Sequence, residues 1–109
     1  MDNKEELLNQ QLEELKDCYR QELPQRLAEV KSLWQQATAA WSARPLTELC
    51  TSLHRISGSA GSFGYRELSA FAAKAELLLK PYSKTGNAPD NNELDILNTA
   101  IEQVVRYEY

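Results

Sequence analysis

The sequence predicts an all-α protein, folded as an antiparallel up-down four-helix bundle with an additional N-terminal helical segment. Residues that favour helices (Leu, Ala, Glu, Gln and Lys) dominate its 109 positions, and the strand-favouring Val and Ile are scarce. Apolar side chains recur every three or four residues over most of the chain, which is the period of an amphipathic helix. Only four glycines and four prolines are present, so a loop-rich or disordered chain is not expected.

The first helical region begins near Asn3, where Asn3 and Glu6 are spaced as a capping box. Pro24 removes a backbone donor and disfavours helical geometry just before it, so a break or a kink is expected there. The apolar pattern continues beyond it, which indicates one long kinked helix or two helices in succession. The apolar positions are Leu8, Leu12, Leu15, Tyr19, Leu27, Val30, Trp34, Ala37 and Trp41. The two tryptophans are predicted to pack in the core.

Pro45 is suited to the first turn of a second helix, and Gly64 is suited to a left-handed cap at its end. Its predicted apolar face contains Leu46, Leu49, Leu53, Ile56, Ala60 and Phe63. A third helix is expected to end at Pro81, with a face formed by Leu68, Phe71, Ala72, Ala75, Leu78 and Leu79.

The segment 81–92 is predicted to be a polar loop, and Asp90 and Glu93 are spaced as the capping box of a last helix. Its apolar face contains Leu94, Leu97, Ile101, Val104 and Val105. The other connections are short, which favours antiparallel neighbours. Residues 1–109 therefore form one domain, which either stands alone or is the N-terminal module of a longer chain.

Composition argues against several functions. The net charge is −4 and no basic run is present, which disfavours nucleic-acid binding. No apolar stretch approaches the roughly 20 residues of a membrane span, and the polar N-terminus lacks the apolar core of a secretory signal. A cytoplasmic location is expected. Cys18 and Cys50 are isolated in the sequence, so both are predicted to be buried free thiols.

The only histidine, His54, lies on the order of 120° around the second helix from the centre of its apolar face. It should therefore face solvent, with Gly58 one turn along and Gly61 on the same side. A glycine inside a helix costs about 1 kcal/mol relative to alanine. Either another molecule approaches the histidine closely, or a neighbouring helix packs against the glycines and His54 is an ordinary surface residue.

The stretch "HRISGSAGSFG" resembles the signature of histidine-containing phosphotransfer (HPt) domains. His54, Ile56, Gly58 and Gly64 occupy its histidine, leucine and two glycine positions. The flanking "YRQELPQRL" and "LSAFAAKAE" also resemble family members, many of which have a glutamate at the position of Glu76. The similarity extends from about Leu12 to Lys80.

The resemblance implies that His54 accepts a phosphoryl group from a receiver-domain aspartate and passes it to another receiver. Gly58, Gly61 and Ser62 would provide clearance and docking beside it. The lysine that the family usually has three residues after the histidine is Ser57 here. Ser57 and Arg55 are therefore candidate phosphoryl contacts.

Two further sets of residues are candidates for the site. Lys74 and Lys80 are additional sources of charge. Leu8 and Leu12 would join the docking surface if the N-terminal segment packed across the bundle, but both are expected in the core.

The expected partners are a response-regulator receiver domain and a hybrid sensor kinase. The chain has no glycine-rich ATP loop and no acidic metal cluster in its sequence, so it is expected to be a phosphoryl carrier and not an enzyme. It should bind no metal or cofactor itself, and the resemblance places Mg²⁺ on the receiver. A monomer is expected. The alternative is a non-catalytic adaptor that binds a receiver or another signalling protein without phosphotransfer, and a plain oligomerisation module is a third, less supported interpretation.

Overall fold

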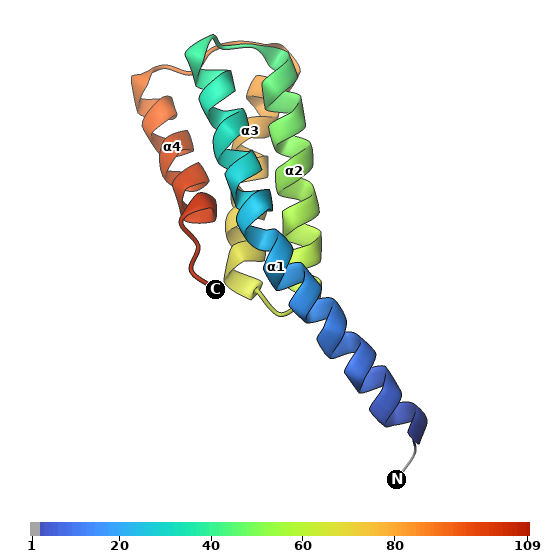
Figure 1. Ribbon diagram of the computed structural model, residues 1–109. Helices are drawn as coiled ribbons and strands as arrows, with labels where there is room; N and C mark the ends of the chain where they lie inside the picture. The colour runs from blue at the N-terminus through green and yellow to red at the C-terminus, as the bar shows by residue number, and fades with distance from the viewer. Residues whose placement is uncertain (1–2) are drawn as a thin grey trace.

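The computed structural model describes residues 3–109, which form an up-down bundle of four helices (Figure 1). The helices are α1 (Asn3–Ala39), α2 (Ala43–Ser62), α3 (Arg66–Thr85) and α4 (Asn91–Val105). Helix α1 packs against α2 and α4, and α3 packs against the same two helices from the opposite corner. The all-α class and the antiparallel four-helix architecture predicted from the sequence are therefore confirmed.

One apolar core runs through the middle of the bundle, and α2, α3, α4 and the part of α1 from Tyr19 onwards contribute to it from the faces predicted by their spacing. The earlier apolar positions of α1, Leu15 among them, are exposed. Ten side chains are the largest among those almost fully removed from solvent: Leu23, Leu46, Leu49, Leu53, Ile56, Leu68, Leu79, Ile101, Val30 and Val104. Trp34 is also buried, and its ring meets that of Trp41 edge to face at 6.2 Å. Trp34 lies in the core as predicted, whereas Trp41 is partly buried and packs against the core from outside.

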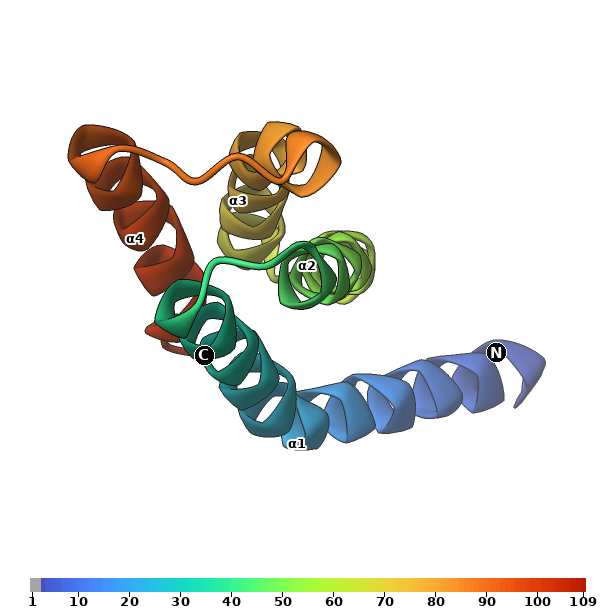
Figure 2. The same cartoon turned by 90° about the horizontal axis from the view of Figure 1, so that it is seen from above.

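Helix α1 is continuous through Pro24, and Figure 2 shows its axis changing direction between the blue N-terminal part and the teal C-terminal part. A proline leaves the carbonyl four residues earlier without its helical donor, here that of Arg20. Both residues are exposed, so that carbonyl is open to water. Leu23 and Leu27 are buried on either side of the proline and hold the helix together. Of the two predicted alternatives, the single kinked helix is correct.

The first turns of α1 project beyond the rest of the bundle (Figure 1), and the molecule measures 60 × 23 × 19 Å. The predicted N-terminal helical segment is thus the start of α1, with Asn3 as its first described helical residue. Leu8 and Leu12 are 64% and 45% exposed. The prediction that they lie in the core is wrong, and so is the prediction that Cys18 is buried. No other helix reaches this level of α1, so its apolar side has no neighbour among the described residues.

Helix α3 does not end at Pro81 as predicted, but continues to Thr85 and ends at Gly86, whose φ of 73° is left-handed. Leu77, the residue whose carbonyl loses its donor to the proline ring, is 71% exposed, so water can satisfy it. The extra turn is held by Tyr82, which donates to the Glu93 carboxylate and packs edge-on against Trp41. That bond raises the pKa of Tyr82 to about 12.

The predicted capping box of α4 is confirmed. The Asp90 carboxylate accepts from the Glu93 backbone N–H at 2.7 Å, and the Glu93 carboxylate accepts from the Asp90 N–H at 3.2 Å. Within residues 3–109, none of the helices combines the length and apolar character that a membrane crossing requires.

Candidate functional site

Helix α2 presents His54 to solvent because the apolar residues on the other side of the helix are buried in the core. Leu53 is fully buried and Ile56 is 1% exposed, so the helix can rotate in neither direction without losing their burial. The His54 side chain is left 77% exposed. The exposed position predicted from the helical spacing is therefore observed.

Glu76 on α3 lies beside the imidazole. Both of its carboxylate oxygens are 3.2 Å from His54 Nδ1, and its side chain is only 20% exposed. A carboxylate can only accept, so Nδ1 carries the proton in this contact. In the neutral ring the lone pair is then on Nε2, the nitrogen that has no partner among the described residues. The pairing therefore selects the tautomer whose outward nitrogen is a nucleophile.

The two glycines downstream of His54 have different surroundings. A Cβ at Gly58 would meet nothing within 4 Å, whereas a Cβ at Gly61 would lie 3.1 Å from Ser69 Oγ on α3. Ser69 is held there because its hydroxyl donates to the Ser57 carbonyl at 2.6 Å. Of the two interpretations drawn from the sequence, open clearance applies to Gly58 and close helix packing applies to Gly61.

The end of α2 is shaped by Gly64, whose φ is 90°. The Tyr65 N–H donates to the Ala60 carbonyl at 2.8 Å, and the Gly64 N–H donates to the Gly61 carbonyl at 3.3 Å. This pair of bonds is a Schellman motif, the left-handed cap that the sequence predicts. Ser62, the last residue of the helix, is exposed and donates to the Gly58 carbonyl at 3.1 Å.

A contact with α1 fixes the same end of α2. Ser59 Oγ donates to the Arg55 carbonyl at 2.8 Å and lies 2.8 Å from the Tyr19 hydroxyl, which therefore acts as the donor to it. The Phe63 ring stacks on Tyr19 at 4.8 Å. The sequence predicts Tyr19 and Phe63 on apolar faces, but it does not predict the hydrogen bond between Tyr19 and Ser59. Neither of these two hydroxyl groups has a recognisable spacing signal in the sequence.

On the other side of His54, towards the start of α2, the surface has a depression of about 340 Å³ between α2 and α3. Its lining includes Cys50, His54, Arg55, Glu76, Lys80 and Lys84. Burial raises the pKa of the Cys50 thiol, and the Glu76 carboxylate raises it further, so this half-buried cysteine stays protonated. Of the residues predicted to contact a phosphoryl group, Arg55 lines the depression and Ser57 does not; of the two lysines, Lys80 lines it and Lys74 does not.

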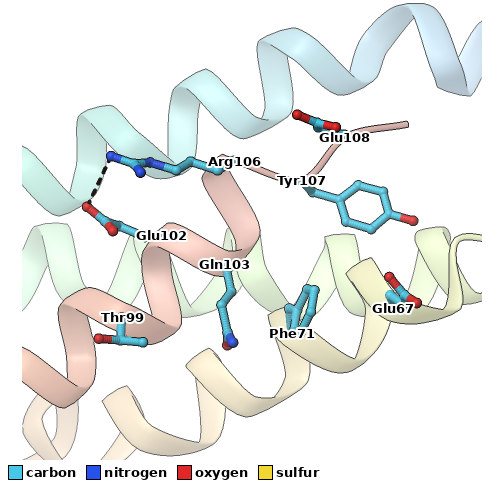
Figure 3. Close-up of a pocket in the computed structure, with 8 residues that line it drawn as sticks. All are labelled: Glu67, Phe71, Thr99, Glu102, Gln103, Arg106, Tyr107 and Glu108. Carbon is cyan, nitrogen blue, oxygen red and sulfur yellow. Dashed lines mark ion pairs between the residues drawn. The ribbon is translucent and has the colours of Figure 1, made fainter.

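A second hollow, of about 440 Å³, lies between the start of α3 and the end of α4 (Figure 3). Its charged lining is mostly acidic, with Glu67, Glu102 and Glu108, and Arg106 is paired with Glu102 at 3.7 Å. It shares no residue with the depression beside His54. The exposed imidazole and its surroundings are therefore the stronger candidate for chemistry.

The described residues contain no group of three or more His, Cys, Asp or Glu side chains placed to hold a metal ion. Helix α2 instead offers one outward nucleophile, oriented by a carboxylate of α3 and bordered by an open glycine. Together the fold and this site define a helical bundle of the histidine phosphotransfer class.

The comparison with protein families agrees with that class. The Hpt domain model matches residues 14–107, and the chain belongs to this family, as the resemblance in the sequence implied. Neither the curated proteins nor the solved structures contain a significant match to the chain.

Proposed function

We propose that the chain is a phosphorelay intermediate of two-component signalling: His54 accepts a phosphoryl group from a receiver aspartate and passes it to a second receiver. The observation that carries this proposal is the exposed imidazole whose Nδ1 is 3.2 Å from the Glu76 carboxylate. The chain then acts as a phosphoryl carrier and not as an enzyme with its own kinase or ATP site.

The chemistry follows from the tautomer. The Nε2 lone pair attacks the phosphorus of the aspartyl phosphate in line, the Nε2–P bond forms and the P–O bond to the aspartate breaks. The bonding electron pair leaves with the aspartate as carboxylate. The ring becomes positively charged, since Nδ1 keeps its proton, and the Glu76 carboxylate stabilises that charge. Transfer to the second receiver is the same step in reverse.

Docking of the receiver is proposed on the Gly58 side of His54. The open space over Gly58 and the exposed Ser62 leave room for the loops of another active site. Gly61 is also exposed, so its backbone contributes to the proposed docking surface. The space that a Cβ at Gly61 would occupy is bordered by Ser69. Mg²⁺ would be held by the receiver, and this chain would need no cofactor of its own.

The wider setting is also part of the proposal. A hybrid sensor kinase is the expected source of the phosphoryl group, and a cytoplasmic monomer is the expected form of the chain. Arg55 is the better supported of the two predicted phosphoryl contacts, because it lines the depression next to His54 whereas Ser57 does not.

The test is transfer from a receiver labelled with radioactive phosphate. Label that moves to the chain, is lost in acid and is stable in base is expected for phosphohistidine, and His54→Gln should abolish it. Label that persists in His54→Gln would refute the role of His54. A receiver that binds the chain but never transfers label would support the adaptor function instead.

A further inference from the structure

Charge is distributed unevenly along the α2–α3 surface around His54. On the side of Gly58 the neighbouring α2 side chains are Ser57, Gly58 and Ser62, none of which is charged. On the opposite side, the depression is lined by three cationic residues, Arg55, Lys80 and Lys84. Three cations therefore lie together on the side of His54 towards the start of α2, away from the surface proposed for docking.

The register of the two antiparallel helices places Lys80 next to the imidazole. Glu76 faces His54, and the hydroxyls of Thr47 and Ser83 meet at 3.1 Å further along the same groove. Lys80 lies between these two contacts, about 6 Å along α3 from Glu76. Its ammonium group also opposes the rise in the pKa of Cys50, the residue one helical turn before His54. Lys80 and His54 line the same depression.

A phosphoryl group on Nε2 would need a cation at this position. The phosphoryl group adds a charge of about −1.5 to −2 near neutral pH. The negative carboxylate of Glu76 already lies beside the other ring nitrogen, Nδ1. Lys80 is exposed and forms no ion pair within the part of the chain that the structure describes. Its ammonium is thus available to the phosphoryl oxygens without breaking an existing contact.

Lys84 lies a further turn from the histidine on α3. Arg55 points about 100° around α2 from His54 and also lines the groove that contains Glu29 and Glu48, so its guanidinium is shared between two surfaces. Lys80 is therefore the cation that is closer to His54 along α3 than Lys84 and that, unlike Arg55, lines only the depression beside His54.

We propose that Lys80 binds the phosphoryl group carried by His54, with Lys84 as an outer second cation. This inference rests on the proposed function and adds the residue that stabilises the charge on the transferred group. No bond is made or broken by Lys80, because its contribution is an ion pair with the phosphoryl oxygens.

The test uses the whole chain phosphorylated by phosphoramidate, a small donor that needs no receiver. Lys80→Ala is compared with Lys74→Ala, an exposed lysine of the same helix that does not line the depression. Loss of a nearby cation should raise the pKa of the phosphoryl group in a ³¹P NMR titration by about half a unit and slow phosphorylation several-fold. Lys74→Ala should match the wild type in both measurements.

Ser57→Lys in the Lys80→Ala background supplies a cation from the other side of His54, and it should restore part of the rate. Equal phosphoryl pKa values and equal rates for Lys80→Ala and Lys74→Ala would overturn the role of Lys80 and leave the proposed function intact. If the wild type took up no more phosphate than His54→Gln, the proposed function itself would fail. Thermal midpoints of both alanine variants should equal that of the wild type, because both lysines are exposed.

Discussion

Gly58 and Gly61 lie within one turn of each other on α2, yet they face different neighbours. The position of a Cβ is open at Gly58 and is 3.1 Å from Ser69 Oγ at Gly61. Both residues lower the intrinsic stability of the helix by a similar amount. At Gly61 the absent side chain allows α2 and α3 to approach, whereas at Gly58 it leaves room only for something outside the chain. One glycine therefore serves the fold, and the other is proposed to serve a partner.

The largest expected effect comes from filling the open position. Gly58→Leu should reduce phosphoryl transfer from a receiver by about a hundredfold, since a small displacement of the reacting groups is that costly. The thermal midpoint should not fall, because the side chain points into solvent. Stopped-flow measurement of the transfer rate checks the first expectation, and thermal unfolding checks the second.

Thr99→Leu is the matched control for that variant, because it adds a leucine at an exposed position of α4, a helix that does not pack against α2. Its transfer rate should equal that of the wild type. Normal transfer by Gly58→Leu would show that the space over Gly58 is not used for docking.

The next largest effect concerns the packed position. Gly61→Leu forces a large side chain against Ser69 and should destabilise the bundle by about 1–3 kcal/mol, as overpacking usually does. The thermal midpoint should fall by several degrees, roughly 4–8 °C for each kcal/mol in a domain near this size. A midpoint unchanged from the wild type would mean that α3 can move aside at no cost.

A smaller effect separates the two alanine variants. Gly58→Ala should stabilise the protein by up to about 1 kcal/mol through helix propensity alone. Gly61→Ala should gain less, because its methyl group would meet a hydroxyl that is held by the Ser57 carbonyl at 2.6 Å. Urea unfolding of both variants measures the difference, and an equal gain would place Gly61 in open space too.

The smallest effect tests the cause of that difference. Ser69→Gly removes the side chain that Gly61→Ala would meet, so the alanine should gain more stability in the Ser69→Gly background than in the wild type, by about 0.5 kcal/mol. A double-mutant cycle built from urea unfolding gives this coupling. Purely additive free energies would show that the 3.1 Å contact carries no strain.

The features that the sequence predicts correctly are those that depend on one helix alone. The period of apolar residues determined which side of α2 is buried, and the exposure of His54 followed from it. The capping box at Asp90 and the left-handed cap at Gly64 are also local, since their bonds join residues only a few positions apart. These features could be read from the chain because their partners are encoded next to them.

The predictions that are wrong concern features that depend on an element distant in the sequence. Leu8 and Leu12 have the same spacing as the buried part of α1, but no helix reaches their level, so they are exposed. Pro81 was expected to end α3, yet the contacts of Tyr82 with Trp41 and Glu93 carry the helix beyond it. A proline makes the end of a helix favourable without requiring it, and packing on the next turn can outweigh that preference.

The sequence by itself determined four amphipathic helices and an imidazole on the outer side of the second, because the helical period places side chains around an axis without reference to other elements. Only the tertiary structure decided which carboxylate and which lysine lie beside that imidazole. Glu76 and Lys80 are more than twenty residues from His54 along the chain, and the register in which α3 packs against α2 sets their distance from it. The register results from the fit of two whole helix surfaces, which no short motif contains.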